Sequence, residues 1–425
     1  KEAHCVVIGM GYVGLPLAVE LAEAGFRTTG VDISQHKVDE LQAGRSYVKD
    51  IETDRLAPLV SSGILTATTD FEALNTADCV SICVPTPLAK TRDPDITYIQ
   101  SAGTQVADRL HAGMLIVLES TTYPGTTREV LLPAFERSGL VPGKDFFLAF
   151  SPERVDPGNP VYQTKNTPKV VGGIEAASSE VAKAFYEKFI DTVVPVSSAE
   201  AAEMTKILEN TFRSVNIGLV NEMAIMCDKL GIDVWEVIRA ASTKPFGYMP
   251  FYPGPGLGGH CIPIDPHYLS WKLKTVNYNA RFIELAGDIN SHMPNFCVFK
   301  IANILNNCEK PIRGSDILII GVAYKPDIDD LRESPALDII NVCRSHGGNV
   351  SFHDPYATSL KLPGAGIMKS VELTKENLQK ADLVVITTHH SNIDWEFVGQ
   401  HARVVYDTRD AMRNVSPCKA EIVRL

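Results

Sequence analysis

The chain has 425 residues, enough for two or three domains, and 45% of them are hydrophobic and 21% charged, as in globular proteins. The formal net charge of −11 argues against nucleic acid or an anionic membrane surface as a partner. No apolar run is long enough to span a bilayer, and the N-terminus leads straight into a strand pattern, so we expect no membrane segment and no signal peptide.

The N-terminal segment carries a dinucleotide-binding pattern. The apolar strand Cys5–Gly9 leads into Gly-Met-Gly-Tyr-Val-Gly, a helical stretch follows, and a second strand, Thr28–Val31, ends at an acidic residue. The three glycines suit a tight turn, a close approach of the pyrophosphate and packing of helix on strand. The acid accepts hydrogen bonds from a ribose 2′-OH and repels a 2′-phosphate, so NAD is favoured over NADP. The expected cofactor contacts are Gly9, Gly11, Tyr12, Val13, Gly14 and Asp32.

Further α/β units follow, and their strands end in polar residues. The runs Ala77–Pro87 and Met114–Thr121 end at or near hydroxyl side chains, at the edge where a parallel sheet binds ligands. Turn chemistry alone would also explain Thr86 and Thr121, but their shared position favours contact with the cofactor. The next strand, Phe147–Phe150, leads to Glu153 and Arg154, which form either a solvated pair or a charged loop in a cleft.

A long helix is predicted from about Ser197 to Leu230, because the stretch lacks proline and its apolar residues recur at helical spacing. Lys206 and Asn210 lie four residues apart and share one face of this helix. They are either ordinary exposed residues or groups within reach of a ligand.

A second helix is predicted at 279–307, packed beside the first, and Pro294 should kink or divide it.

The segment Pro253–Pro266 is a loop, because four glycines and four prolines in fourteen positions exclude a regular helix or strand. It contains one thiol, Cys261, and one carboxylate, Asp265. Taken alone, this stretch fits a buried structural cysteine and a presented nucleophilic thiolate about equally well.

The nine cysteines are odd in number and scattered, with no CxxC pair and no Cys/His cluster at zinc spacing. The sequence therefore predicts no metal site. Cysteines without a disulfide framework are typical of reducing compartments, so we expect a cytoplasmic protein in which Cys261 stays a thiol.

The C-terminal part reads as a second α/β region, with strands beginning at 316, 349, 383 and 404. The turn after its first strand lacks GxGxxG, so a second dinucleotide site is not indicated. Lys325 and Arg332 could bind phosphate there, although composition alone favours a mixed-charge surface loop.

Together these residues resemble the nucleotide-sugar 6-dehydrogenase family, which includes the UDP-glucose, UDP-N-acetylglucosamine and UDP-N-acetylmannosamine dehydrogenases. The resemblance covers essentially the whole chain, in order. The segments that carry it are the N-terminal GMGYVGLP, Ser120-Thr121, Ser151-Pro-Glu-Arg154, Lys206-x-x-x-Asn210, the Cys261 loop, and Lys325 with Arg332-Glu-Ser-Pro335.

This resemblance implies an α/β fold with two Rossmann-like domains, each a doubly wound parallel sheet, joined by a central helical domain. The implied boundaries are 1–196 for the NAD domain, 197–310 for the helical dimerisation domain with the cysteine loop, and 311–425 for the UDP-sugar domain. The implied activity is a four-electron oxidation of the sugar C6 alcohol to a carboxylate, with two NAD and one water, for surface polysaccharide synthesis.

The resemblance also implies residue roles. Cys261 would form a thiohemiacetal and then a thioester, supported by Lys206 and Asn210 at the oxyanion, while Asp265, Glu153 and Thr121 position water and move protons. The implied substrate contacts are Glu153, Arg154, Lys206, Asn210, Gly258 and Lys325, and Arg332 is expected at the cofactor.

One position bears on the sugar. The UDP-glucose branch usually has Lys before the Asp of the cysteine loop, whereas this chain has Ile264. The loop therefore resembles the N-acetylhexosamine branch, and the segments 244–247 and 281–287 look most like UDP-N-acetylglucosamine 6-dehydrogenases. UDP-N-acetylmannosamine, UDP-N-acetylgalactosamine and UDP-glucose stay open as substrates.

Two other functions compete with this interpretation. A two-electron β-hydroxyacid dehydrogenase would share the N-terminal domain and a long helix, but it needs neither the cysteine loop nor a second α/β domain. A catalytically silent nucleotide-sugar-binding protein would not need Cys261, Lys206, Asn210 and Asp265 together.

Overall fold

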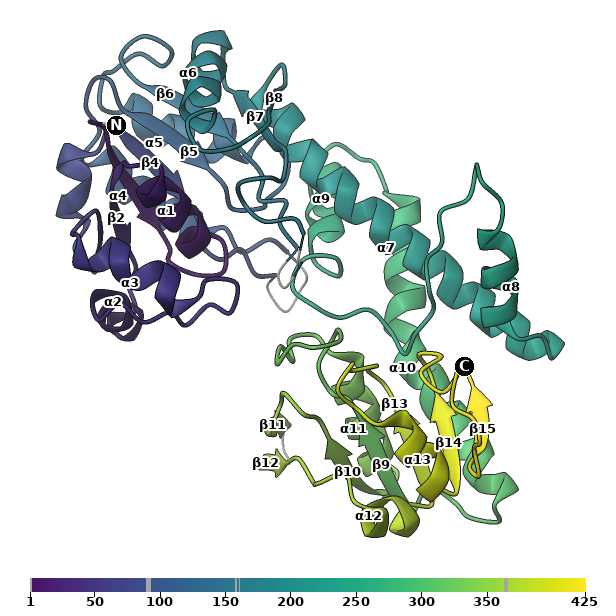
Figure 1. Cartoon of the computed structure of the whole chain (residues 1–425). Helices are drawn as coiled ribbons and strands as arrows, with labels where there is room; N and C mark the ends of the chain where they lie inside the picture. Colours follow the sequence, from purple (N-terminus) through teal and green to yellow (C-terminus); the bar gives the residue numbers. More distant parts are fainter. Residues whose placement is uncertain (1, 89–92, 157–158, 160, 363–365) are drawn as a thin grey trace. The chain divides into compact units, whose positions relative to one another are not determined.

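The structure is a computed structural model that describes residues 2–88, 93–156, 159, 161–362 and 366–425. The chain forms two compact units (Figure 1). The first contains Lys1–Glu209 and His267–Tyr278, and the second contains Asn210–Pro266 and Asn279–Leu425. The expected three-domain boundaries stay a prediction.

The first unit is built on an eight-stranded sheet in the order β3-β2-β1-β4-β5-β6-β7-β8. Its first six positions follow the Rossmann order 3-2-1-4-5-6. The strands are β1 (His4–Ile8), β2 (Arg27–Val31), β3 (Leu65–Thr68), β4 (Cys79–Ile82), β5 (Leu115–Leu118), β6 (Phe147–Phe150), β7 (Lys169–Gly173) and β8 (Val193–Pro195).

Both faces of this sheet are buried, which explains its nearly continuous apolar strands. Alternate residues of β1 point to opposite cores: Cys5 and Val7 join one cluster, and Val6 and Ile8 join another. The covering helices are α1 (Gly14–Glu23), α2 (Gln35–Gln42), α3 (Thr53–Ser61), α4 (Thr97–Ala107), α5 (Leu132–Glu136) and α6 (Ala176–Tyr186), with short turns η1 (Phe71–Thr76) and η2 (Thr127–Leu131).

Two strands depart from the expected all-parallel arrangement, because β8 pairs parallel with β7 and both run against the other six strands. The pairs from β3 to β6 are parallel, but β7 runs antiparallel to β6, with Phe150 opposite Gly172. The first residue of β7, Lys169, therefore lies at the edge of the sheet where β4, β5 and β6 end.

The long helix is confirmed as α7 (Ala199–Leu230). The Ser198 hydroxyl accepts a hydrogen bond from the Ala201 amide at 3.1 Å and so caps its start. Gly231, at φ +68°, follows its last residue.

The second predicted helix is α10 (Arg281–Asn307), and it packs beside α7 as expected. The Asn221 amide of α7 donates to the Asn290 side chain at 2.9 Å. Pro294 lies inside α10 without dividing it, so the expected division is wrong. Two shorter helices are α8 (Val234–Ser242) and α9 (Asp265–Lys274).

The second unit contains an all-parallel sheet in the order β10-β9-β13-β14-β15. Numbered within the unit, this order is 2-1-3-4-5, the other common doubly wound arrangement. Its strands are β9 (Asp316–Ile320), β10 (Asn349–His353), β13 (Leu383–Ile386), β14 (Val404–Asp407) and β15 (Glu421–Arg424). The remaining elements are α11 (Pro335–Ser345), α12 (Lys375–Lys380), α13 (Trp395–His401) and the hairpin β11 (Ser359–Leu362) with β12 (Gly366–Lys369).

Within the described ranges, no helix combines the length and the hydropathy needed to cross a membrane.

Candidate active site

The glycine-rich turn after β1 has the geometry of a dinucleotide site. Gly9 adopts φ +93°, and a Cβ there would lie 2.5 Å from the Cys83 carbonyl oxygen. A Cβ on Gly14 would lie 1.9 Å from the Gly9 oxygen, so helix α1 packs directly on the turn. Nothing lies within 4 Å of the Cβ position of Gly11, which leaves room for a phosphate to approach. These positions fit NAD.

The acidic residue at the end of β2 ties this turn to the sheet. Asp32 Oδ2 accepts the Met10 amide at 2.9 Å, and Oδ1 accepts the Ser34 amide at 2.9 Å. The Lys37 ammonium lies 2.9 Å from Oδ2. These hydrogen bonds engage part of the Asp32 carboxylate in the turn, and the residue is only 6% exposed. Its expected selection of NAD over NADP stays a prediction.

Of the other residues expected at the cofactor, four belong to the first unit and one belongs to the second. Tyr12 is exposed beside the turn, and Val13 directly precedes α1. Thr86 is buried past β4, and its carbonyl accepts the Tyr268 hydroxyl. Thr121 follows β5 and is half-buried. Arg332, by contrast, belongs to the second unit, so its expected role at the cofactor stays a prediction.

A charged cluster lies at the same edge of the first unit, past the end of β6. Glu153 Oε1 accepts the Arg154 and Val155 amides at 2.7 Å each. Its backbone oxygen accepts the Lys206 ammonium at 2.5 Å. Burial opposes ionisation of Glu153, but the charge of Lys169 and the amide hydrogen bonds outweigh it and lower the pKa of the carboxyl.

Arg154 is held by its own partners. Its guanidinium lies 2.7 Å from the Glu209 carboxylate and donates to the Pro168 carbonyl at 2.6 Å. The expected residues Glu153, Arg154 and Lys206 are thus brought together within one unit.

The cysteine loop lies in the second unit and places Cys261 before a helix. The Cys261 carbonyl accepts the Ile264 and Asp265 amides at 3.1 and 2.8 Å, at the start of α9. The Asp265 carboxylate in turn accepts the Asn210 amide at 2.5 Å, and both side chains are buried. The Cys261 thiol is exposed, and the partial positive charge at a helix N-terminus favours an anionic thiolate nearby.

The glycines of this loop allow close packing. A Cβ on Gly258 would lie 2.7 Å from the Glu333 carbonyl oxygen and from the Tyr324 Cβ, and one on Gly259 would lie 2.8 Å from the Tyr324 ring. The Gly259 amide donates to the Arg332 carbonyl at 3.1 Å. The loop is therefore fixed against the turn that follows β9.

Arg332 contributes its backbone to the loop, whereas its side chain pairs with an acid. The guanidinium donates to both oxygens of Asp330, at distances from 2.6 to 3.0 Å.

A cavity of about 810 Å³ opens in the second unit, past the ends of β9, β13 and β14. Aromatic and basic side chains line it together, among them Trp235, Tyr252, Tyr324, Lys325, Trp395 and Arg409. This volume and lining suit a ligand with a flat ring and anionic groups.

Arg409, which lines this cavity, was not predicted from the sequence. Its Nε donates to the Thr387 carbonyl at 2.9 Å, which aims the side chain across the strand ends. A Cβ on Gly254 would lie 2.4 Å from its guanidinium, so the cysteine loop packs on it. Burial lowers the pKa of Arg409 to about 10, and the group stays charged at neutral pH. Its place directly after a predicted strand was the signal that could have found it.

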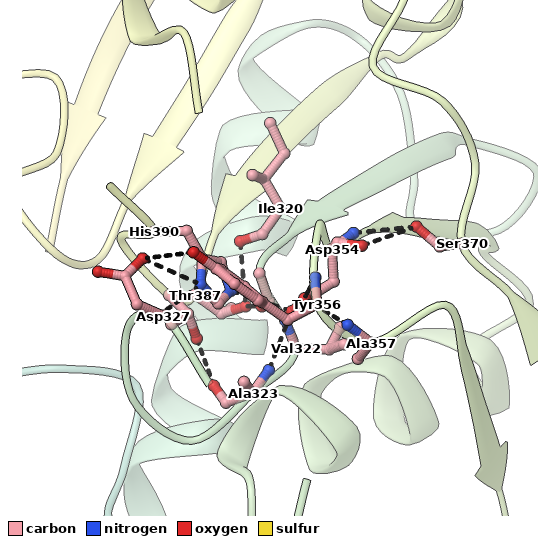
Figure 2. Close-up of polar contacts among 12 residues, drawn as sticks. Ile320, Val322, Ala323, Asp327, Asp354, Tyr356, Ala357, Ser370, Thr387 and His390 are labelled. Carbon is pink, nitrogen blue, oxygen red and sulfur yellow. Dashed lines mark hydrogen bonds and ion pairs between the residues drawn. The ribbon is translucent and has the colours of Figure 1, made fainter. Parts of the chain in front are cut away.

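The turn that carries Lys325 is held by a buried His–Asp pair (Figure 2). Asp354, at the end of β10, accepts the Val322 amide at 2.7 Å and His390 Nε2 at 3.0 Å. His390 Nδ1 accepts the Asp327 amide at 3.0 Å. Although burial opposes it, hydrogen bonds from His390 and backbone amides lower the pKa of Asp354 to about 2. This carboxylate therefore braces the turn that carries Lys325.

The expected site residues therefore fall into two groups. Thr121, Glu153, Arg154 and Lys206 belong to the first unit, and Asn210, Gly258, Cys261, Asp265 and Lys325 belong to the second. Helix α7 carries one residue of each group, Lys206 and Asn210, four positions apart. In the parts of the chain that the structure covers, no three His, Cys, Asp or Glu side chains are grouped as metal ligands.

Three family models match the chain in order. They are the NAD-binding domain of the UDP-glucose/GDP-mannose dehydrogenase family at residues 3–190, its central domain at 200–292 and its UDP-binding domain at 318–414.

Individual proteins match over nearly their full length. A UDP-N-acetyl-D-mannosamine dehydrogenase of Pyrococcus horikoshii is 34% identical over 413 residues, covering 96% of this chain and 95% of that protein. An NDP-N-acetyl-D-galactosaminuronic acid dehydrogenase of Ralstonia nicotianae is 36% identical over 417 residues, covering 95% of each chain. A solved structure of the UDP-D-ManNAc dehydrogenase from Pyrococcus horikoshii matches with a TM-score of 0.89 and 31% identity, covering 99% of each chain.

The resemblance stated from the sequence and the two-sheet α/β fold are thus confirmed. The chain belongs to the UDP-glucose/GDP-mannose dehydrogenase family and is an NAD-dependent enzyme that oxidises a UDP-sugar.

Proposed function

We propose that this enzyme oxidises the C6 alcohol of a UDP-N-acetylhexosamine to the carboxylate in two oxidations, the second of which depends on one thiol. The observation that carries the proposal is the arrangement around Cys261, whose carbonyl accepts the amide of Asp265, while the carboxylate of Asp265 accepts the Asn210 amide. A two-electron alcohol dehydrogenase has no use for an exposed thiol held in this way.

The chemistry follows from the oxidation states. Removal of a proton and a hydride turns the alcohol into an aldehyde, which carries no further hydride that can leave directly. Addition of the Cys261 thiolate to the aldehyde carbon gives a thiohemiacetal, which loses the second hydride and becomes a thioester. Water then hydrolyses the thioester, releasing the carboxylate and the thiol. NAD, when bound, accepts the hydride in each oxidation.

The remaining groups stabilise charge and move protons. Each addition to the C6 carbonyl places negative charge on its oxygen, and Lys206 and Asn210 are the expected donors. Glu153, Asp265 and Thr121 are the expected groups that take or supply protons and position water. The lowered pKa of Glu153 supports a carboxylate that is ionised at neutral pH.

The UDP portion is proposed to bind the cavity of the second unit. The rings of Trp235 and Tyr252 lie 6.3 Å apart at an interplanar angle of 16°, which supports recognition of a flat base. Lys325 and Arg409 line the same cavity and supply positive charge for a diphosphate in a protein whose net charge is negative.

The sequence and the similar proteins point to different sugars. The sequence favours N-acetylglucosamine, whereas the similar proteins described above are dehydrogenases of N-acetylmannosamine or an N-acetylgalactosamine derivative. We therefore propose the N-acetylhexosamine class and expect one member to be strongly preferred over UDP-glucose.

The test is a panel of UDP-hexoses with NAD, in which both NADH formed and sugar consumed are measured. We expect two NADH for each preferred sugar and a uronic acid as the product. One NADH per sugar would refute the thioester route, and preference for UDP-glucose would refute the N-acetylhexosamine class.

We also propose a homodimer that forms through the central helices, and a cytoplasmic location. Exposed apolar residues on α7 support the homodimer, since Leu219 is 54% exposed. All nine cysteines lie in the described ranges and none forms a disulfide there, which supports the cytoplasmic location. Product use in surface polysaccharide synthesis stays a prediction from the resemblance.

A further inference from the structure

The antiparallel strand β7 brings a buried lysine to the ligand edge of the first sheet. Lys169 is the first residue of β7, and β7 runs against β6. The Ser151 hydroxyl, just past β6, donates to the Val170 carbonyl at 2.7 Å and fixes the two strands at this end. In an all-parallel sheet the first residue of a strand would lie at the opposite edge.

Lys169 is shared between two carboxylates there. Its ammonium lies 2.5 Å from Glu119 Oε2 and 3.6 Å from Glu153 Oε2. The side chain of Lys169 is 4% exposed, that of Glu119 is not exposed at all, and that of Glu153 is 15% exposed. The Tyr186 hydroxyl donates to the other oxygen of Glu119 at 2.7 Å. Glu119 is therefore fully buried, whereas Glu153 keeps some access to solvent.

A buried ion pair of this kind is poorly explained by stability alone. Removing both charges from water costs about as much as their attraction returns, and an apolar pair of similar volume is often as stable or more so. The pair lies next to two expected catalytic positions, because Thr121 is two residues past Glu119 in the chain and the Lys169 ammonium lies 3.6 Å from Glu153 Oε2.

We propose that Lys169, anchored by Glu119, is a positioning residue that holds the Glu153 carboxylate in place and ionised for the oxidation. This inference rests on the proposed function, because it assumes that Glu153 acts there. The Glu153 carboxylate is held from two sides, by backbone amides on Oε1 and by the Lys169 ammonium near Oε2. Its backbone oxygen meanwhile receives Lys206, so a shift of Glu153 would move Lys206 as well.

The charges that face Glu153 are Lys169, Lys206 and, behind Lys169, Glu119. Two further titratable groups stay neutral, because burial raises the pKa of the Cys83 thiol and of the Tyr186 hydroxyl. Despite its burial, the charges of Glu119 and Glu153 raise the pKa of Lys169, which therefore stays protonated over the working pH range. Lys169 is thus a fixed positive charge, and the negative charge of Glu119 weakens its electrostatic effect on the Glu153 carboxylate.

This arrangement predicts opposite effects of two substitutions on the acid limb of the kcat/KM pH profile. Lys169→Met removes the positive charge, so Glu153 protonates more easily and the limb should move to higher pH by roughly one unit. Glu119→Gln removes the competing carboxylate and strengthens the effect of Lys169, so the limb should move to lower pH. Lys169→Arg keeps the charge and should leave the limb near that of the unchanged enzyme.

A matched control is available on α6, where Lys183 forms an exposed pair with Glu187 at 3.6 Å. Lys183→Met should leave the pH profile unchanged. A purely structural role for Lys169 would lower the melting temperature in both core variants without opposite pH shifts, and this result would overturn the inference. If Lys169→Met does not fold, the direction of the Glu119→Gln shift decides alone.

Glu153→Gln separates the two levels of the proposal. If this variant loses the acid limb while Lys169→Met and Glu119→Gln leave it in place, the inference about Lys169 fails and the proposed role of Glu153 stands. If Glu153→Gln keeps both full activity and the limb, the role of Glu153 in the proposed function fails, and the inference fails with it.

Discussion

At the scale of single residues, Cys261 separates the two oxidations. Cys261→Ser should still allow the first hydride to leave, because that step needs no thiolate. The second oxidation should stop, since a serine hydroxyl has a far higher pKa than a thiol and adds poorly to the aldehyde without a base. We expect at most one NADH per sugar, measured by absorbance, together with aldehyde detectable by a carbonyl reagent. Complete conversion to the acid by this variant would contradict the nucleophile assignment.

Arg409 offers a second test, directed at binding. Arg409→Met should raise KM for the UDP-sugar about 10- to 100-fold, the loss typical of hydrogen bonds to a charged group, with a smaller change in kcat. NAD binding, followed by calorimetry without the sugar, should stay unchanged. Arg403→Met is the control, because the Arg403 side chain is 68% exposed and lies 4.0 Å from Asp382. An unchanged KM in Arg409→Met would remove Arg409 from the proposed UDP site.

At the scale of elements, the start of α7 holds the turn that follows Thr121. Glu203 is fully buried and accepts the Gly125 amide at 2.5 Å and the Thr127 amide at 2.9 Å. Burial outweighs these hydrogen bonds and raises the pKa of Glu203 to about 7. A raised carboxyl pKa contributes stability that is fully present below the unfolded value, near 4.5, and is lost as pH rises through about 7.

Glu203→Gln should therefore change stability in a pH-dependent way. The amide cannot ionise, so the stability of the variant should rise relative to that of the unchanged protein as pH goes from about 4.5 to 7, by roughly 3 kcal/mol. A loss of stability that does not depend on pH is superimposed, because the side-chain amide nitrogen of the variant would face a backbone N–H donor. Melting temperatures of both proteins across this range give the comparison. Parallel pH dependences would contradict the raised pKa.

The sequence predicted the elements whose pattern is local. Buried parallel strands such as β1 and β5 are continuous apolar runs, and α7 shows helical spacing between a serine cap and Gly231. The direction of a strand leaves no such local pattern in the sequence, because β7 has the same composition whether it runs parallel or antiparallel to β6. Lys169 was missed for this reason, since only the direction of β7 places it at the ligand edge.

Of the two effects expected of Pro294, a kink or a division of the helix, division was wrong for a related reason. A proline inside a helix removes one hydrogen bond, and the sequence alone does not show whether packing offsets this loss. In the structure Pro294 and its neighbour Met293 are buried within α10, next to Asn290, which donates to the Ser214 carbonyl of α7 at 3.1 Å. Tertiary contacts of this kind keep α10 in one piece.

At the scale of the whole molecule, the two units divide the expected chemistry between them. The first holds the turn that fits NAD and the charged cluster around Glu153, and the second holds Cys261 and the cavity with Lys325. Neither unit alone contains every expected catalytic residue. The sequence predicted these residues from ordered motifs, whereas cavity residues such as Arg409, which belong to none of those motifs, required the structure.

The central helices also support a prediction about assembly. Phe212, Leu219 and Met226 lie seven residues apart on α7, and each is at least 41% exposed. On α10, Phe282 is 76% exposed. A stripe of exposed apolar residues at heptad spacing suits helix pairing, and a self-complementary surface gives a closed two-fold dimer.

Leu219→Asp should therefore weaken the dimer by at least about tenfold, because burying an unpaired carboxylate at the interface is costly. Light scattering across a concentration series would measure the dissociation constant. Ile367→Asp, at an equally apolar and 71% exposed position on β12, should leave the dimer intact and so controls for a general effect of added charge. A monomeric unchanged protein at micromolar concentration, or a Leu219→Asp dimer of unchanged affinity, would show that this stripe has another role.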